Sequence, residues 1–181
     1  MNEEIKKEEK WIILGVSVIF FVGALLHFAY EFSGNNKLIG LFVPVNESVW
    51  EHLKMLILPT ILWWLGFYYF SGEKLGINAD RWFTATLVSL VTSMVFMVAF
   101  FYTYTGALGF ESIAVDILDT FLSVLAGQLA GLHFYRYSKG MKWWIALTLI
   151  ILIVILFAVF TINPPHLPIF LDSVTKTYGI Q

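Results

Sequence analysis

The 181-residue chain is 59% hydrophobic and 18% aromatic, and only 13% of its residues are charged. This composition is far more apolar than the roughly half-apolar mixture typical of soluble domains, so it indicates a membrane protein. The formal net charge of -2 leaves no basic excess for a nucleic-acid partner. The chain has no cysteine, which excludes disulfide bonds, thiolate metal ligands and a cysteine nucleophile.

Five apolar stretches are long enough to cross a hydrocarbon core of about 30 Å as helices, and they are too continuous for barrel strands. The first is also too long an apolar run for a secretory signal. The fourth carries Asp116, Asp119, Gln128 and His133, so a buried or tilted helix is the alternative there. We therefore expect an all-α, polytopic bundle in one membrane domain, residues 1–181, with spans near 11–32, 47–70, 82–107, 112–137 and 143–162 and a tail at 163–181.

The basic residues of the short connections predict the orientation of this bundle. Most of them fall on one side, and the positive-inside rule places that side in the cytoplasm. We expect a multi-pass protein of the plasma membrane with its N-terminus inside and its tail outside. The inner set is Lys6, Lys7, Lys10, Lys74, Arg81, Arg136, Lys139 and Lys142, against Lys37 and Lys176 in the outer loops.

Ionisable residues gather at the outer ends of the predicted spans. With a rise of 1.5 Å per residue, His27 should lie about 8 Å below the outer end of the first helix, and Lys54 and Asp119 about 10 Å inside. An unpaired charge at such a depth costs roughly 2.5 to 3.5 kcal/mol, so we expect Lys54 to contact Asp119 or Asp116, or water. The candidate catalytic or ligand-binding residues are His27, Glu31, Glu47, Glu51, His52, Lys54, Asp116 and Asp119.

Imidazoles with carboxylates form the usual ligand set of Zn²⁺ and similar divalent ions. The sequence has no His-Glu-x-x-His signature, and Lys54 would compete with a cation for the same carboxylates. The alternative is that the glutamates simply lie in the solvated headgroup region. The candidate metal ligands are His27, Glu31, Glu51, His52 and His166.

Local signals add expectations about helix ends and packing. Pro44 and Asn46 should end the preceding loop and cap a second helix that starts near Glu47, and Pro59 should kink that helix. Small residues on the fourth helix allow another helix to approach closely, either within the chain or in a homodimer. These small residues are Ser123, Gly127 and Gly131.

The tail contains three prolines near His166, so it cannot be helical there. Apolar residues interleave with His166 and Asp172 along it. We expect the tail to fold over the outer helix ends and close the polar site, with a disordered tail as the alternative.

Two resemblances follow from particular strings. The segments LLHFAYEFSGNNKLIGLFVPVNESVWEHLK, FYTYTGALG and NPPHLPIFLDSVTKTYGI resemble an uncharacterised family of small five-helix integral membrane proteins, found mainly in Firmicutes. That resemblance covers nearly the whole chain and implies the five-span topology but no activity. His27 and Glu31, one turn apart, distantly resemble the sterol isomerase and sigma-2 receptor group, which implies a pocket for hydrophobic amines or sterols.

Three functions fit these patterns. The first is an enzyme that acts on a lipid or amphiphile from the outer leaflet through the His, Glu, Asp and Lys residues. The second is binding, sensing or transport of a cation or an amine-like ligand through the same pocket. The third is a polar layer that only fixes helix packing.

Overall fold

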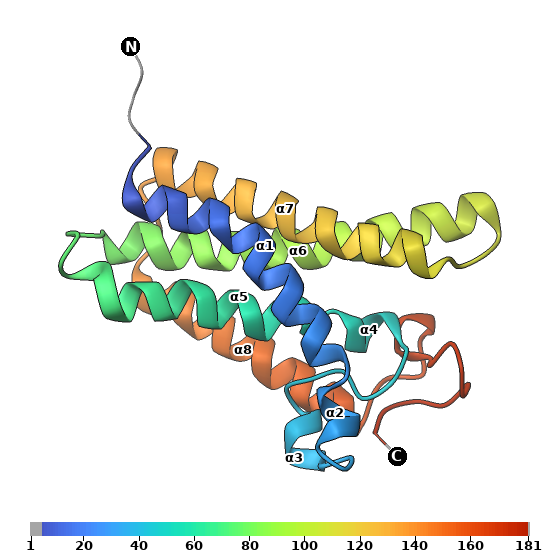
Figure 1. Ribbon diagram of the computed structural model, residues 1–181. Coiled ribbons are helices and arrows are strands. Elements are labelled where there is room, and N and C mark those ends of the chain that lie inside the picture. The colour runs from blue at the N-terminus through green and yellow to red at the C-terminus, as the bar shows by residue number, and fades with distance from the viewer. Residues whose placement is uncertain (1–4, 181) are drawn as a thin grey trace.

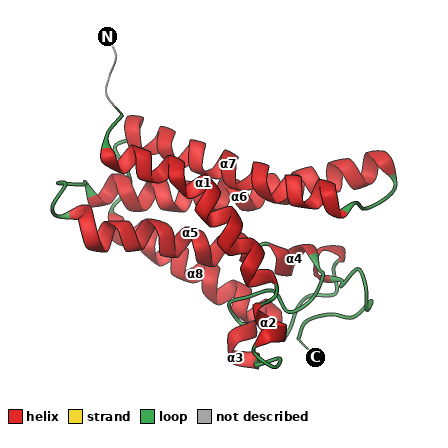
Figure 2. Ribbon diagram, viewed as in Figure 1, coloured by secondary structure: helices red, strands yellow, loops and turns green. Residues whose placement is uncertain are grey.

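A computed structural model describes residues 5–180 as an all-helical bundle (Figures 1 and 2). Five of its helical segments are long and apolar enough to cross a membrane, which confirms the predicted fold class, and the fourth segment is one of them. The observed bounds shift by a few residues from those predicted. The five segments are Lys7–His27 (α1), Val49–Gly72 (α4, α5 and a π-helical turn), Ala79–Leu108 (α6), Ile113–Tyr137 (α7) and Trp143–Ile162 (α8).

The longest elements, α6 and α7, form an antiparallel hairpin whose closed end extends past the other long helices (Figure 1). Gly109 ends α6 with a φ of 74°, a left-handed conformation that suits glycine. A Cβ atom at Gly127 would lie 1.9 Å from Ser93 Oγ and 2.5 Å from the Ser89 carbonyl oxygen, so the two helices touch through small residues. The stripe predicted on the fourth span is therefore buried within the chain and needs no second copy to cover it.

The first span, α1, packs against both the hairpin and α5. Near its start, Trp11 stacks on Trp63 with 3.9 Å between ring centroids, and each indole N–H donates to the other residue's carbonyl oxygen. Arg136 of α7 forms a bidentate pair with the buried Glu9 at the same end, with N–O distances of 2.7 and 3.0 Å. These polar links were not predicted, because they join residues more than 50 positions apart.

The second span is built in pieces. Ser48, not Asn46, caps it, with its Oγ accepting from the Glu51 amide, so the helix starts at Val49 and Glu47 lies outside it. A turn at Leu53 separates α4 (Val49–His52) from α5 (Lys54–Phe67). Pro59 lies inside α5, and the helix continues through it. The second span is therefore interrupted at Leu53, before the proline at which a kink was predicted.

The end of the bundle at which α1 and α8 finish carries the short helices α2 (Ala29–Phe32) and α3 (Lys37–Gly40) and the C-terminal tail (Figure 1). The tail is folded, as predicted. Phe170 is buried and packs against Trp50, with 4.7 Å between their ring centroids. An isolated antiparallel β-bridge pairs Leu171 with Tyr178. Pro164 and Pro165 lie outside any helix, as predicted, but Pro168 begins a 3₁₀ helix that ends at Phe170, where a non-helical tail was predicted.

Candidate metal centre

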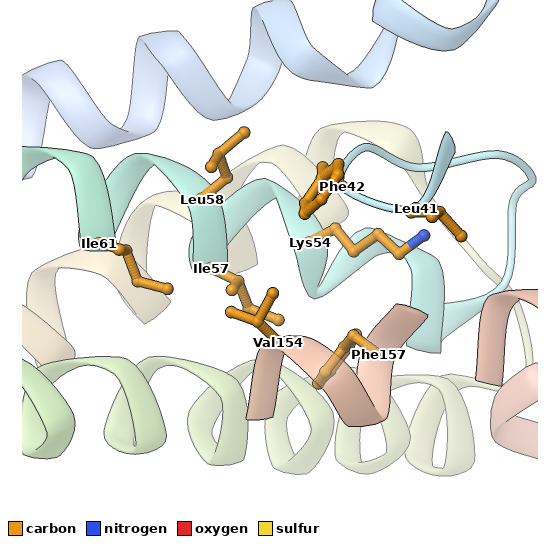
Figure 3. A pocket seen from close by; sticks show the side chains of 8 residues that line it. All are labelled: Leu41, Phe42, Lys54, Ile57, Leu58, Ile61, Val154 and Phe157. Atoms are coloured by element: carbon orange, nitrogen blue, oxygen red, sulfur yellow. The ribbon is translucent and has the colours of Figure 1, made fainter. Parts of the chain in front are cut away.

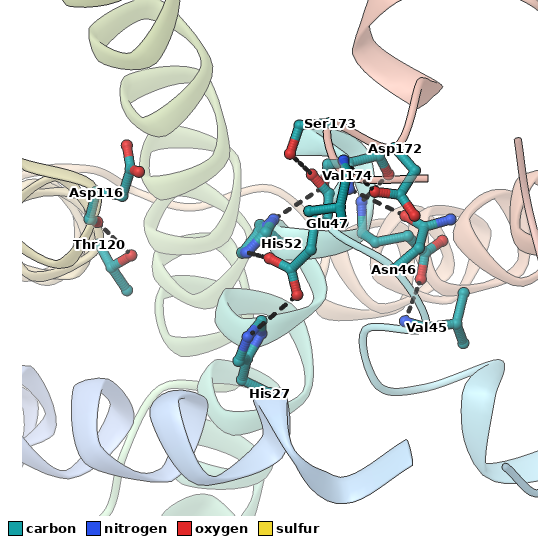
Figure 4. A network of polar contacts seen from close by, with 12 residues as sticks. His27, Val45, Asn46, Glu47, His52, Asp116, Thr120, Asp172, Ser173 and Val174 are labelled. Atoms are coloured by element: carbon teal, nitrogen blue, oxygen red, sulfur yellow. Dashed lines mark hydrogen bonds and ion pairs between the residues drawn. The ribbon is translucent and has the colours of Figure 1, made fainter. Parts of the chain in front are cut away.

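Three of the predicted residues converge where the end of α1 meets α4 (Figure 4). His27 is the last residue of α1, because the helix breaks at Phe28. The predicted first helix continued to about Phe32, whereas the observed α1 ends at His27. Glu47 lies in the loop before α4, and His52 is the last residue of α4.

The two imidazoles flank a single carboxylate. His27 Nε2 lies 3.5 Å from Glu47 Oε1, and His52 Nε2 lies 3.3 Å from Glu47 Oε2. The rings are nearly parallel, with their centroids 5.2 Å apart. One ligand atom from each residue can be chosen so that all three lie within 4.8 Å of one another.

Hydrogen bonding fixes the tautomer of His52. Its Nδ1 lies 2.9 Å from the Ser48 carbonyl oxygen, which can only accept, so Nδ1 carries the proton. In a neutral ring, Nε2 then presents a lone pair to the Glu47 carboxylate at 3.3 Å. Two acceptors at that distance repel unless a second proton or a cation lies between them.

His27 also lacks one partner. Its Nδ1 is buried and has no hydrogen bond among the residues that the structure describes. Protonating both rings would place two positive charges face to face at 5.2 Å, which is unfavourable. A shared divalent cation would satisfy both Nε2 lone pairs and the carboxylate at once.

The loop that carries Glu47 is held on both sides. The Asn46 side chain accepts from the Ser48 amide at 3.0 Å and donates to the Gly179 carbonyl oxygen at 3.1 Å. Ser173 Oγ donates to the Glu47 carbonyl oxygen at 3.3 Å. When His52 also carries a proton on Nε2, its hydrogen bond to Glu47 lowers the pKa of that carboxyl below its ordinary value, so Glu47 is charged at neutral pH.

The predicted contact of Lys54 with Asp119 or Asp116 is wrong. Lys54 Nζ instead lies 2.6 Å from Glu51 Oε2, and it donates to the carbonyl oxygens of Gly40 and Val43 at 2.7 and 3.2 Å. Glu51 also accepts from Thr161 Oγ1 and the Val45 amide. Both partners of this ion pair are buried, and together they tie the loop after α3 to α5 and α8.

Lys54 and Glu51 therefore do not face a ligand pocket. The cavity beside Lys54 is about 20 Å³, is lined mainly by apolar side chains, and has room for about one water molecule (Figure 3). It is far too small for a lipid or an amphiphile. The ion pair holds neighbouring segments together. Both Glu51 oxygens already accept from Lys54, Thr161 or the Val45 amide, so Glu51 is not available as a metal ligand.

The remaining candidates lie near the site or away from it. Glu31 is exposed and, among described residues, makes no ion pair with His27. Asp116 accepts a hydrogen bond from the Tyr104 hydroxyl, and the buried Asp119 accepts from Ser123 Oγ at 3.0 Å. The exposed His166 stacks on Tyr178, with centroids 4.5 Å apart, within the tail. Three of the five predicted metal ligands, Glu31, Glu51 and His166, are thus outside the cluster.

Glu47 was predicted as a catalytic or ligand-binding residue, although it was not among the five candidate metal ligands, and it supplies the carboxylate of the cluster. The Ser48 cap leaves Glu47 in the loop before α4, where its carboxylate lies between the two histidines. The local signal was available, because a serine just before an apolar helical run is a strong N-cap. The contact between the end of α1 and this loop could not be predicted, because no local sequence pattern specifies which distant segments pack together.

The geometry suits a small divalent ion. Zn²⁺ binds imidazole nitrogen at about 2.0 to 2.1 Å, so the edge of a tetrahedral site is about 3.3 to 3.4 Å. The separations of 3.3 and 3.5 Å, each from one imidazole nitrogen to a different oxygen of Glu47, are close to that edge. The Ser48 carbonyl fixes the ligand tautomer of His52, as is usual for zinc-bound histidines.

Fold and site together define a membrane-spanning type of helical bundle with a His–Glu–His cluster at one end. Within this class, the chain belongs to the family described as "Family of unknown function (DUF6512)", which matches residues 1–180. No curated protein and no solved structure matches the chain.

Proposed function

We propose that this chain is a multi-pass plasma-membrane protein that binds one divalent metal ion, Zn²⁺ by preference, through His27, Glu47 and His52. The cluster is on the extracytoplasmic side in this proposal, as the distribution of lysine and arginine favours. The observation that carries it is the His52 ring. Its Nδ1 proton is committed to Ser48, while its Nε2 faces a carboxylate that offers no proton of its own.

Exposure supports a site that exchanges metal with the outside. The side chains of His27, His52 and Glu47 are 25%, 30% and 43% exposed. An ion could enter without opening the bundle, and one coordination position would remain for water or another ligand. This favours binding, sensing or delivery of the metal over a purely structural layer.

Metal titration of purified protein, with any affinity tag removed, tests this proposal. A competing chromophoric chelator should report one Zn²⁺ per chain for the unaltered protein. Removing one ligand in His27→Ala or His52→Ala should weaken binding by at least about 100-fold, because even second-shell changes cost about 10- to 100-fold. The matched control is His166→Ala, which removes a histidine outside the cluster and should bind as the unaltered protein does.

Two results contradict the proposal. One is equal zinc affinity in His27→Ala, His52→Ala and the unaltered protein. The other is a loss in His166→Ala as large as in the two cluster variants. Thermal unfolding of the metal-free variants separates loss of a ligand from loss of fold, since a structural layer would show lower melting temperatures without any zinc effect.

A catalytic use of the metal is the second candidate, and one observation favours it. Two imidazoles and one carboxylate leave an open coordination position, which is typical of catalytic zinc sites. A bound ion there could polarise an ester or phosphoryl oxygen of an outer-leaflet lipid. Zinc-loaded protein incubated with total membrane lipid should then change the lipid profile, while His52→Ala should not; identical profiles for the two proteins would eliminate catalysis on those lipids.

A further inference from the structure

A second site lies at the same end of the bundle and shares no residue with the metal cluster. It is a groove of about 390 Å³ between α3, the end of α8 and the tail. This volume is within the range of about 300 to 1,000 Å³ that is usual for ligand sites. Its lining is Lys37, Leu38, Leu41, Ile162 and Ile180.

The floor of the groove is apolar and open. Leu38 is 74% exposed and Ile162, the last residue of α8, is 64% exposed. Two further apolar residues of the segment between the first two spans, Phe32 and Phe42, are also exposed. Such a surface is costly in water, so this segment belongs in the interfacial layer of the membrane, where hydrocarbon can cover it.

The rim of the groove carries one positive charge. Lys37 is exposed, and among the described residues it forms no ion pair. Among residues 5–180, no carboxylate side chain lines the groove. Lys37 is also one of only two basic residues in the loops on this side of the bundle.

We propose that this groove binds one anionic phospholipid from the adjacent leaflet. The lipid phosphate pairs with the Lys37 ammonium, and one acyl chain lies along Leu38, Leu41 and Ile162. A cation beside an apolar floor matches a molecule with a negative head and a hydrocarbon tail. A free phosphate ion would leave the floor uncovered, which is why the lipid is the occupant.

Native mass spectrometry of the full chain, released from micelles containing phosphatidylglycerol or phosphatidylcholine, tests this inference. The unaltered protein should retain one phosphatidylglycerol in preference to phosphatidylcholine. Lys37→Gln should lower the retained phosphatidylglycerol about fivefold, the factor expected for one basic residue near an anionic headgroup, and leave phosphatidylcholine unchanged. Leu38→Gln should weaken the retention of both lipids.

The matched control is Lys176→Gln, which removes the other basic residue of this side without touching the groove. It should retain phosphatidylglycerol as the unaltered protein does. Equal losses in Lys37→Gln and Lys176→Gln, equal retention of the two lipids by the unaltered protein, or no retained lipid would each overturn the inference. None of these outcomes depends on zinc binding, so the two proposals fail independently.

Discussion

At the scale of single residues, the charge of Glu47 is what holds the cluster together. Its carboxylate contacts both His27 and His52, and in the metal-free protein a hydrogen bond from protonated Nε2 of His52 keeps the pKa of Glu47 below the ordinary value of 4.5. Burial and the charge of Asp172 oppose that shift. Since the pKa is lowered on folding, the charged form stabilises the protein above pH 4.5, and this contribution is lost as the pH falls through the folded-state value.

A pH series on metal-free protein checks this sign. The unaltered protein should melt higher than Glu47→Gln near neutral pH, and the difference should shrink as the pH falls from about 5 to about 3. Its size should be at most about 1 kcal/mol, because the Glu47 side chain is 43% exposed and solvent screens the pair. A difference that widens on acidification would refute this role for Glu47.

The buried pair of Glu51 and Lys54 should respond very differently. Lys54→Met leaves the Glu51 carboxylate buried without its cation, and breaking such a pair costs about 3 to 5 kcal/mol of unfolding free energy. The double variant Lys54→Met/Glu51→Gln should recover much of that loss. Chemical unfolding in mild detergent would measure both.

Lys142 provides the control for this pair. It lies 3.5 Å from Asp80 but is 71% exposed, so Lys142→Met should cost no more than about 1 kcal/mol. Similar losses for Lys54→Met and Lys142→Met would show that burial does not set the strength of these pairs.

At the scale of elements, the contact between α6 and α7 depends on the absence of a side chain. A Cβ at Gly127 would meet Ser93 Oγ and the rigid Ser89 carbonyl, so Gly127→Ala should push the helices apart. Overpacking of this kind costs about 1 to 3 kcal/mol. The measurement is the melting temperature of the variant.

Gly66 is the matched control, because a Cβ there meets nothing within 4 Å and the residue also lies inside a helix. Gly66→Ala should leave the melting temperature unchanged or raise it, since alanine favours helix by up to about 1 kcal/mol. Equal melting temperatures for Gly127→Ala and Gly66→Ala would show that the packing of α6 against α7 does not depend on the missing side chain at Gly127.

The elements also show what could be read from the sequence. The span at Trp143–Ile162 was predicted to the residue, since hydropathy and flanking lysines define it locally. The predicted end of the first helix was less accurate. The helix breaks at Phe28, and no proline or glycine beside Phe28 indicates this break in the sequence. The partners of Lys54 were missed because two of them are backbone carbonyls, of Gly40 and Val43, which a sequence pattern of side chains does not reveal.

At the scale of the whole molecule, the proposed orientation has a direct test. The chain has no cysteine, so single cysteines can be introduced and labelled with a membrane-impermeant thiol reagent on intact cells. Glu111→Cys, between α6 and α7, should be labelled. Lys74→Cys, between the second and third spans, should be labelled only after the membrane is opened, and the reverse pattern would place the metal cluster on the cytoplasmic side.

The central claim is that His27, Glu47 and His52 hold one metal ion. X-ray absorption at the zinc edge of tag-free, zinc-loaded protein tests it most directly, because the spectrum reports the ligands themselves. We expect a shell of nitrogen and oxygen at about 2.0 to 2.1 Å with scattering from two imidazoles, and from one fewer in His27→Ala. A shell without imidazole, or one that is identical in His27→Ala, would contradict the claim.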